Sequence, residues 1–160
     1  MKLDKKRRRQ YKTNYSKRLV LLKGNCARLV VRKTNKYVIL QLVESKNAKD
    51  KVRYSVNTKE LLKHGWPKNK AGSLKSIPAC YLGGLLLGKK SEKIKKVILD
   101  TGLIPNTKGS RVYAVVKGIS DAGIEINYNE KVLPSQDRIE GKHIKELDFN
   151  KIKEGVGKLS

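Results

Sequence analysis

Three short segments of β-type sequence follow one another between residues 28 and 56, and they constrain the fold more than any other feature. The segments are RLVVRK (28–33), YVILQLVES (37–45) and KVRYSV (51–56). In the last of them Val52, Tyr54 and Val56 alternate with charged or polar residues, which is the period of a strand with one buried side. The connection TNK suits a tight turn, because Asn tolerates positive φ. The sequence therefore predicts an antiparallel three-strand meander with one solvent-facing, basic face.

Helical patterns and one more strand follow the meander. Helices are predicted at residues 57–65, from 78 to about 96 with a possible break near Gly88, and from 110 to 123. A strand is predicted at 95–102. Pro78 suits the first turn of a helix, and Ser110 is expected to cap the third helix. A strand after a helix can join the meander in parallel through a crossover connection. The predicted fold class is α/β, with a single domain whose mixed sheet (the meander plus a parallel strand) is packed by helices.

The balance of charge points to a polyanionic partner. Lys and Arg number 38 against 14 Asp and Glu, a formal net charge of +24. Such an excess repels itself in a compact fold, so nucleic acid is the first expected partner and an anionic membrane the second. Residues 1–129 hold 31 basic and 8 acidic residues, whereas residues 130–160 hold 7 and 6. The last stretch is therefore expected to meet protein, or to extend past the nucleic acid.

The N-terminal segment concentrates this charge. Residues 1–12 have no apolar period and are predicted to form a flexible basic arm. A short helix is predicted next, capped by Thr13 or Asn14 and ended by Gly24. We divide the chain into the arm (1–12), an α/β RNA-binding domain (13–129) and a C-terminal extension (130–160).

Several classes of protein find no support in the sequence. No apolar run approaches the roughly 20 residues of a membrane span, and no apolar region of a signal peptide follows the charged start. Cys26 and Cys80 have no nearby cysteine partner, which favours free thiols in a reducing compartment. No phosphate-binding GxxxxGK[ST] loop occurs, and neither His64 nor His143 has metal-ligand spacing. We predict no cofactor, no metal and no catalysis; an RNA-processing nuclease with a basic arm is the alternative.

The arm is the first candidate RNA contact. Arginine can hold phosphate through two parallel hydrogen bonds, and tyrosine rings can stack on unpaired bases. Tyr15 could equally belong to the core, and both interpretations stay open. The candidate residues are Lys5, Lys6, Arg7, Arg8, Arg9, Tyr11, Lys12 and Tyr15.

Three further places carry candidates, each with a plain structural alternative. The first hairpin gathers basic side chains, although these could simply keep a sheet face soluble. The loop NTKGSR (106–111) leads into a helix whose free N–H groups could hold an anion, although Ser110 could only cap it. Trp66 lies beside basic residues and could equally be a lid on the core. The candidates are Arg28, Arg32, Lys33, Asn35 and Lys36 in the hairpin, Thr107, Lys108, Ser110 and Arg111 in the loop, and Trp66.

Several motifs in order resemble one known family. They are RLVVRKTNKYVILQLVE, KELLKHGW, PACYLGGLLLGKK, VILDTGLIPNTKGSRVYAVVKGISDAGIEI and PSQDRIEGKHI. Together they resemble the archaeal and eukaryotic large-subunit ribosomal proteins that bind 5S ribosomal RNA, which are numbered eighteen in the universal naming scheme. In its length and its motifs the sequence resembles the archaeal members. The resemblance covers nearly all of residues 5–145.

This resemblance implies a structural component of the large ribosomal subunit. It implies an α/β domain docked on 5S rRNA at the central protuberance, in the cytoplasm, with large-subunit rRNA and neighbouring ribosomal proteins as further partners and no membrane. Carried over by position, it supports the arm, hairpin and loop candidates and adds Arg18 and Gly109. Two regions depart from the family pattern. The segment after Trp66 lacks the small polar residues expected before the helix, and the sequence ends at GVGKLS, whereas eukaryotic members continue.

Overall fold

A computed structural model describes residues 3–47, 49–91, 93–144 and 147–157. Residues 1–2 of the predicted arm, and residues 145–146 and 158–160 of the predicted extension, lie outside the described residues. The described strands are β1 (Ala27–Lys33), β2 (Val38–Lys46), β3 (Lys49–Asn57), β4 (Lys96–Asp100) and β5 (Glu125–Ile126). The α-helices are α1 (Lys6–Arg9), α2 (Tyr15–Lys23), α3 (Ile77–Lys90), α4 (Arg111–Asp121), α5 (Gln136–Glu140) and α6 (Phe149–Gly157). Short 3-10 helices are η1 (Thr58–His64), η2 (Lys68–Ser73) and η3 (Glu130–Val132).

The strands form one mixed sheet in the order β3-β2-β1-β4-β5. β1, β2 and β3 pair antiparallel, with Val30 opposite Gln41, so the predicted meander is confirmed. β4 joins in parallel beside β1, with Ala27 opposite Val97. This confirms the α/β class and the mixed sheet. The two-residue β5 pairs in parallel with β4 and was not predicted, because it is too short to show an alternating pattern.

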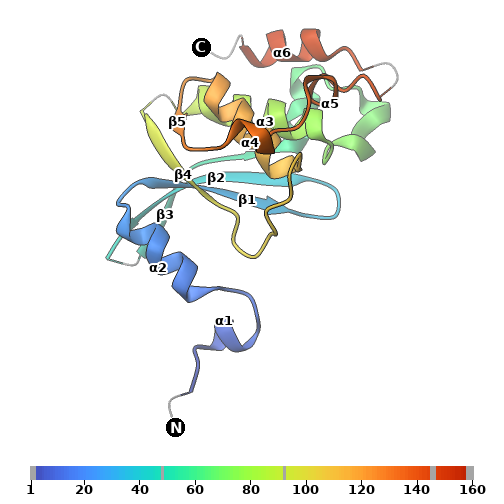
Figure 1. The fold of residues 1–160 in the computed structure, drawn as a ribbon. Helices are drawn as coiled ribbons and strands as arrows, with labels where there is room; N and C mark the ends of the chain where they lie inside the picture. Colours follow the sequence, from blue (N-terminus) through green and yellow to red (C-terminus); the bar gives the residue numbers. More distant parts are fainter. Residues whose placement is uncertain (1–2, 48, 92, 145–146, 158–160) are drawn as a thin grey trace.

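Helices α3 and α4 cover one face of the sheet (Figure 1). In α3 every residue from Ile77 to Gly88 is buried, as expected for a helix enclosed between a sheet and other helices. It ends at Lys90, so the predicted continuation to about Lys96 is wrong: the chain leaves the helix at Ser91, whose hydroxyl donates to the Leu87 carbonyl. The predicted helix after Ser110 is confirmed as α4.

Glycines allow α3 and α4 to touch backbone to backbone. A Cβ built on Gly84 would lie 2.5 Å from the Val115 carbonyl oxygen, and one on Gly118 would lie 2.1 Å from the Tyr81 carbonyl oxygen. No side chain fits at such distances, so the approach of the two helices depends on both glycines.

We expect Gly118→Ala to lower the free energy of unfolding by roughly 1–3 kcal/mol, because the methyl group forces the packed helices apart. The intrinsic helix propensity of alanine, which favours the substitution by about 1 kcal/mol, acts in the opposite direction. Gly157→Ala is the matched control, since Gly157 is also helical and a Cβ there meets nothing within 4 Å. Urea denaturation of both variants measures the difference. Equal stabilities would show that the helix contact yields without strain.

The C-terminal segment packs back on the same core. Phe149, Ile152 and Val156 of α6 are buried against α3 and η1, and the Phe149 ring lies 5.8 Å from that of Tyr81. Trp66, between η1 and η2, is only 2% exposed, and its Nε1–H donates to the Lys70 carbonyl oxygen. This burial contradicts the prediction that Trp66 contacts RNA, and the alternative of a core lid holds.

Helix α2 lies against the opposite face of the sheet from α3 and α4 (Figure 1). Its start at Tyr15, after an Asn14 cap that accepts from the Lys17 backbone N–H, confirms the predicted short helix. No residue of α2 is fully buried, although Leu21 and Leu22 are half-buried. Beneath it Arg28 and Val30 are buried, so the expectation of an entirely solvent-facing basic face is wrong for β1.

Candidate nucleic-acid interface

The described part of the arm carries its charge in full contact with solvent. Lys6–Arg9 form the single turn of α1, and all of these residues are exposed. Arg7 Nε donates to Thr13 Oγ1 (2.9 Å), and Lys5 Nζ lies 4.7 Å from the centre of the Tyr15 ring. The arm thus folds back toward the start of α2, and one face of Tyr15 is already covered by a cation.

Polar bonds help to attach α2 to the sheet, beside the half-buried Leu21 and Leu22. Lys17 Nζ donates to Thr101 Oγ1 at 2.9 Å, just beyond the end of β4. Arg18 donates to the Asp50 carboxylate at 2.9 Å, near the start of β3. Because these side chains are exposed or half-buried, each bond contributes modestly, and two cations of α2 are directed toward the sheet and the groove beside it.

Arg28, one of the predicted RNA contacts, is instead the centre of a buried ionic cluster. It is 2% exposed; its Nη1 donates to Asp100 at 2.7 Å, and its Nη2 donates to Asp50 at 2.9 Å and to Ser45 at 3.1 Å. Burial acts to raise the pKa of Asp50, but hydrogen bonds from Ser45 and Arg18 and the charges of the two arginines outweigh it, so the pKa is lowered. The burial contradicts an RNA-binding role for Arg28, whose charge stabilises the fold.

A groove of about 1180 Å³ runs between the arm, α2 and the segment that follows β4. Seven cationic side chains line it, against the carboxylates of Asp50 and Asp100, which Arg28 already holds. The cations are Lys5, Arg7, Lys12, Lys17, Arg18, Arg32 and Lys33. The groove therefore joins the arm to the first hairpin, two of the predicted clusters.

The turn between β1 and β2 presents the second cluster. Thr34 closes it, with its Oγ1 donating to the Tyr37 carbonyl oxygen at 2.8 Å. Lys33, Asn35 and Lys36 are exposed there. The guanidinium of Arg32 lies against Gly102, where a Cβ would come within 2.8 Å of Nη1. The φ of +58° at Gly102 also favours glycine, so the segment after β4 is shaped around Arg32.

The loop before α4 holds the third cluster. Thr107, Lys108 and Arg111 are exposed, and the Gly109 N–H donates to the Val132 carbonyl oxygen at 2.9 Å. Ser110 occupies the N-cap position, as predicted, but its side chain makes no capping hydrogen bond, and its buried Oγ has no partner in the described structure. The alternative that Ser110 serves only to cap the helix through its side chain is therefore wrong.

The hairpin and this loop meet at one edge of the sheet, although their residues are far apart in sequence. β1 and β4 are parallel, so the segments after both strands leave the same edge. Burial raises the pKa of the Cys80 thiol to about 12, and the charges of Arg111 and Lys33 both act on that thiol in the opposite sense. The parallel pairing of β1 and β4 therefore brings the hairpin and the loop before α4 to one edge of the sheet.

The family model described as "Ribosomal large subunit proteins 60S L5, and 50S L18" matches residues 1–97 and 89–129. The chain belongs to this family of large-subunit ribosomal proteins. It is 46% identical over 145 residues to the large ribosomal subunit protein uL18 of Korarchaeum cryptofilum, covering 89% of this chain and 72% of that protein. It is 43% identical over 141 residues to uL18 of Methanoregula boonei, covering 87% and 79%. The resemblance read from the motifs is confirmed, including its archaeal character.

The matched residues of the family contain all three basic clusters, and the structure adds residues that sequence reasoning missed. Lys17, Leu19 and Leu103 line the groove, and Lys75 Nζ donates to the Asn35 carbonyl oxygen at 3.0 Å beside the hairpin turn. Lys17 lies inside a quoted basic run, but only its bond to Thr101 reveals its position. No sequence pattern assigns Leu19 or Leu103 to a binding surface, because the groove that they line is formed by segments far apart in the chain.

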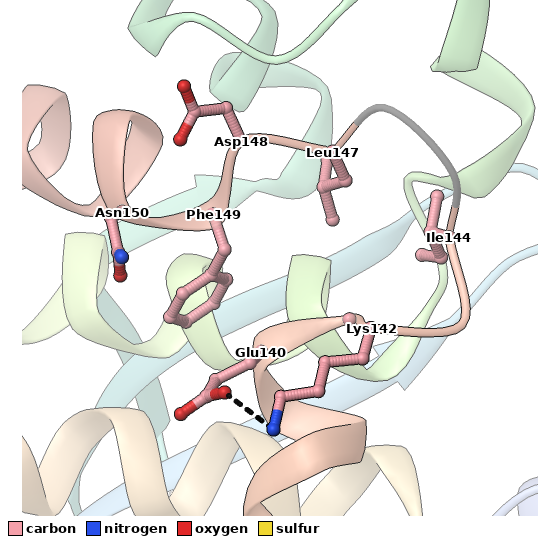
Figure 2. Close-up of a pocket in the computed structure, with 8 residues that line it drawn as sticks. Glu140, Lys142, Ile144, Leu147, Asp148, Phe149 and Asn150 are labelled. Carbon is pink, nitrogen blue, oxygen red and sulfur yellow. Dashed lines mark ion pairs between the residues drawn. The ribbon is translucent and has the colours of Figure 1, made fainter.

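A second hollow, of about 690 Å³, lies in the C-terminal segment (Figure 2). Glu140 and Asp148 line it together with Lys142, whose Nζ lies 3.7 Å from Glu140 Oε2. Lys142 is also paired with Asp137. This near balance of charge agrees with the composition of residues 130–160, and it does not suit a polyanion.

The described residues contain no cluster of three or more His, Cys, Asp or Glu side chains placed to hold a metal ion. Asp100 is bound by Arg28, and Asp121 accepts from the Tyr81 hydroxyl at 2.9 Å and pairs with Lys117. No described helix is both long enough and apolar enough to cross a membrane.

Proposed function

We propose that this chain is a structural RNA-binding component of the large ribosomal subunit, acting in the cytoplasm on 5S rRNA and joining it to large-subunit rRNA and neighbouring ribosomal proteins. The observation that carries the proposal is the arrangement of three basic segments: the arm and hairpin line one groove, and the hairpin and the loop before α4 follow parallel strands at one edge of the sheet. Family membership supports the ribosomal role.

The proposed contacts are the predicted ones without Arg28 and Trp66. They are Lys5, Lys6, Arg7, Arg8, Arg9, Tyr11, Lys12, Tyr15, Arg18, Arg32, Lys33, Asn35, Lys36, Thr107, Lys108, Gly109, Ser110 and Arg111, with Lys17 added. Tyr11 is 87% exposed and free to stack on a base. Phosphate contacts of this kind supply most of the affinity and make it fall with salt.

Titration of purified full-length chain against 5S rRNA tests the proposal, with transfer RNA as a folded competitor of similar charge. We expect tighter binding to 5S rRNA, with log affinity falling by about 0.7–0.9 per phosphate contact for each tenfold rise in salt. Equal affinity for both RNAs at all salt concentrations would contradict the 5S assignment. Chemical footprinting of the complex then locates the contacted nucleotides.

Lys108→Ala and Arg111→Ala test the loop before α4. First-turn N–H groups of α4 lack a side-chain cap, and the helix dipole favours an anion there. We expect each substitution to weaken 5S rRNA binding roughly three- to tenfold and to flatten the salt dependence by about one phosphate contact, with unchanged stability. Lys93→Ala, an exposed lysine outside the proposed surface, is the control. Binding like that of the parent in both loop variants would make the loop purely structural.

The nuclease alternative has a direct assay. Incubation of 5S rRNA with the chain and Mg²⁺ or Mn²⁺ should leave the RNA intact, since the carboxylates of Asp100 and Asp121 are engaged by Arg28 and by Tyr81 and Lys117. Cleavage that depends on metal and increases with protein concentration would favour the enzyme.

A further inference from the structure

The groove between the arm, α2 and the segment after β4 combines two kinds of lining. Cations surround it, yet Leu19 and Leu103 also line it while remaining 57% and 55% exposed. Tyr15, Ile104 and Pro105 extend the apolar lining. Large aliphatic side chains that stay more than half exposed inside a cation-lined groove gain free energy only when a ligand with an apolar surface covers them.

The charge of the groove selects the class of that ligand. Seven cationic side chains face two carboxylates, and Arg18 and Arg28 already pair with these acids. A basic or neutral peptide would gain nothing from this surplus, whereas a phosphodiester chain is complementary to it. The volume of about 1180 Å³ exceeds the roughly 300–1,000 Å³ of common small-molecule sites, so it has room for more than a single small group.

Duplex RNA does not satisfy the apolar part of the lining. An A-form helix stacks its bases inside and displays phosphates, 2′-hydroxyls and base edges, none of which covers a leucine well. An unpaired nucleotide offers a flat apolar base together with its phosphate. The Tyr15 ring is already covered on one face by Lys5, which leaves the two leucines as the principal open apolar contacts.

We propose that this groove binds a looped or single-stranded segment of RNA, with an unpaired base packed on Leu19 and Leu103 and the flanking phosphates held by Lys17, Arg32 and the arm. This inference rests on the proposed function and names the part of an RNA that the groove selects. In this proposal Leu19 and Leu103 recognise unpaired bases, whereas the cationic side chains contact phosphates and set the salt dependence of binding.

Two synthetic RNA duplexes of equal length and without terminal loops test it, one fully paired and the other interrupted by an internal loop of unpaired nucleotides. Full-length chain carrying Leu19→Ala or Leu103→Ala is titrated against both. Val20→Ala is the matched control, because Val20 is the next residue of α2, is 68% exposed and does not line the groove. All three side chains are largely exposed, so thermal melts should match that of the parent.

We expect both leucine variants to bind the duplex with the internal loop roughly three- to tenfold more weakly, and the fully paired duplex within about twofold of the parent. Val20→Ala should match the parent on both RNAs. Equal effects of Leu19→Ala and Val20→Ala, or equal losses on both duplexes, would overturn the inference. The titrations with 5S rRNA and transfer RNA are a separate experiment. Equal affinity for those two RNAs would contradict the 5S assignment without affecting the groove assignment, which depends only on the synthetic RNAs.

Discussion

Removal of residues 1–12 is expected to weaken binding to 5S rRNA by more than about tenfold, while the melting temperature stays nearly unchanged. The arm loses its exposed cations in this variant, including Lys5, Arg7 and Lys12 of the groove. No residue of α1 is buried, so the core keeps its packing. Fluorescence anisotropy with labelled 5S rRNA measures the first effect, and differential scanning calorimetry measures the second.

A charge-matched pair of triple variants separates the position of the charge from its amount. Each removes three exposed cations, one set from the arm and one from outside the proposed surface: Arg7, Arg8 and Arg9 against Lys89, Lys93 and Lys95, all changed to Ala. We expect the arm triple to lose most of the affinity that the deletion loses, and the lysine triple to lose little. Similar losses of affinity in the two triple variants would mean that binding depends only on the net charge of the protein. Unchanged affinity after deletion of residues 1–12 would show that the arm does not contact the RNA.

Asp100→Ala is expected to lower the free energy of unfolding by about 3 kcal/mol or more, toward the 3–5 kcal/mol typical of a broken buried ion pair. Arg28 is buried beneath α2, and its Nη1 donates to Asp100 at 2.7 Å. Without that carboxylate a buried guanidinium keeps only the half-exposed Asp50 and Ser45 as partners. The Gly102 N–H also loses its acceptor on Asp100.

For a chain of this size the loss corresponds to a fall of roughly 6–12 °C in melting temperature. Asp137→Ala is the control, since its carboxylate pairs with Lys142 at the surface, where such pairs contribute about 0–1 kcal/mol. The double variant Arg28→Met with Asp100→Leu should recover part of the loss, because apolar packing replaces the uncompensated charge. A melting temperature of Asp100→Ala equal to that of the control would show that water reaches Arg28.

What the sequence determined by itself is local. The β-type segments and the short TNK turn predicted the meander, because strand period and turn chemistry depend on neighbouring residues. The alternation did not predict the burial of each residue, since Val56 is buried but Val52 is 48% exposed. Pro78 and Asn14 marked helix starts for the same reason. The sequence alone also revealed the run of basic residues in the arm and the ordered family motifs.

Only the tertiary structure decided which of these residues face solvent and which meet. Arg28 and Arg32 lie on the same strand and point to the same face, yet α2 covers one and leaves the other in the groove. Trp66 is buried by packing that its own neighbours do not encode. The hairpin and the loop before α4 reach one edge because β1 and β4 are parallel, and Leu19 and Leu103 line one groove because Lys17 and Arg18 anchor α2 to the sheet. Burial and convergence depend on contacts between distant segments, which no pattern along the chain contains.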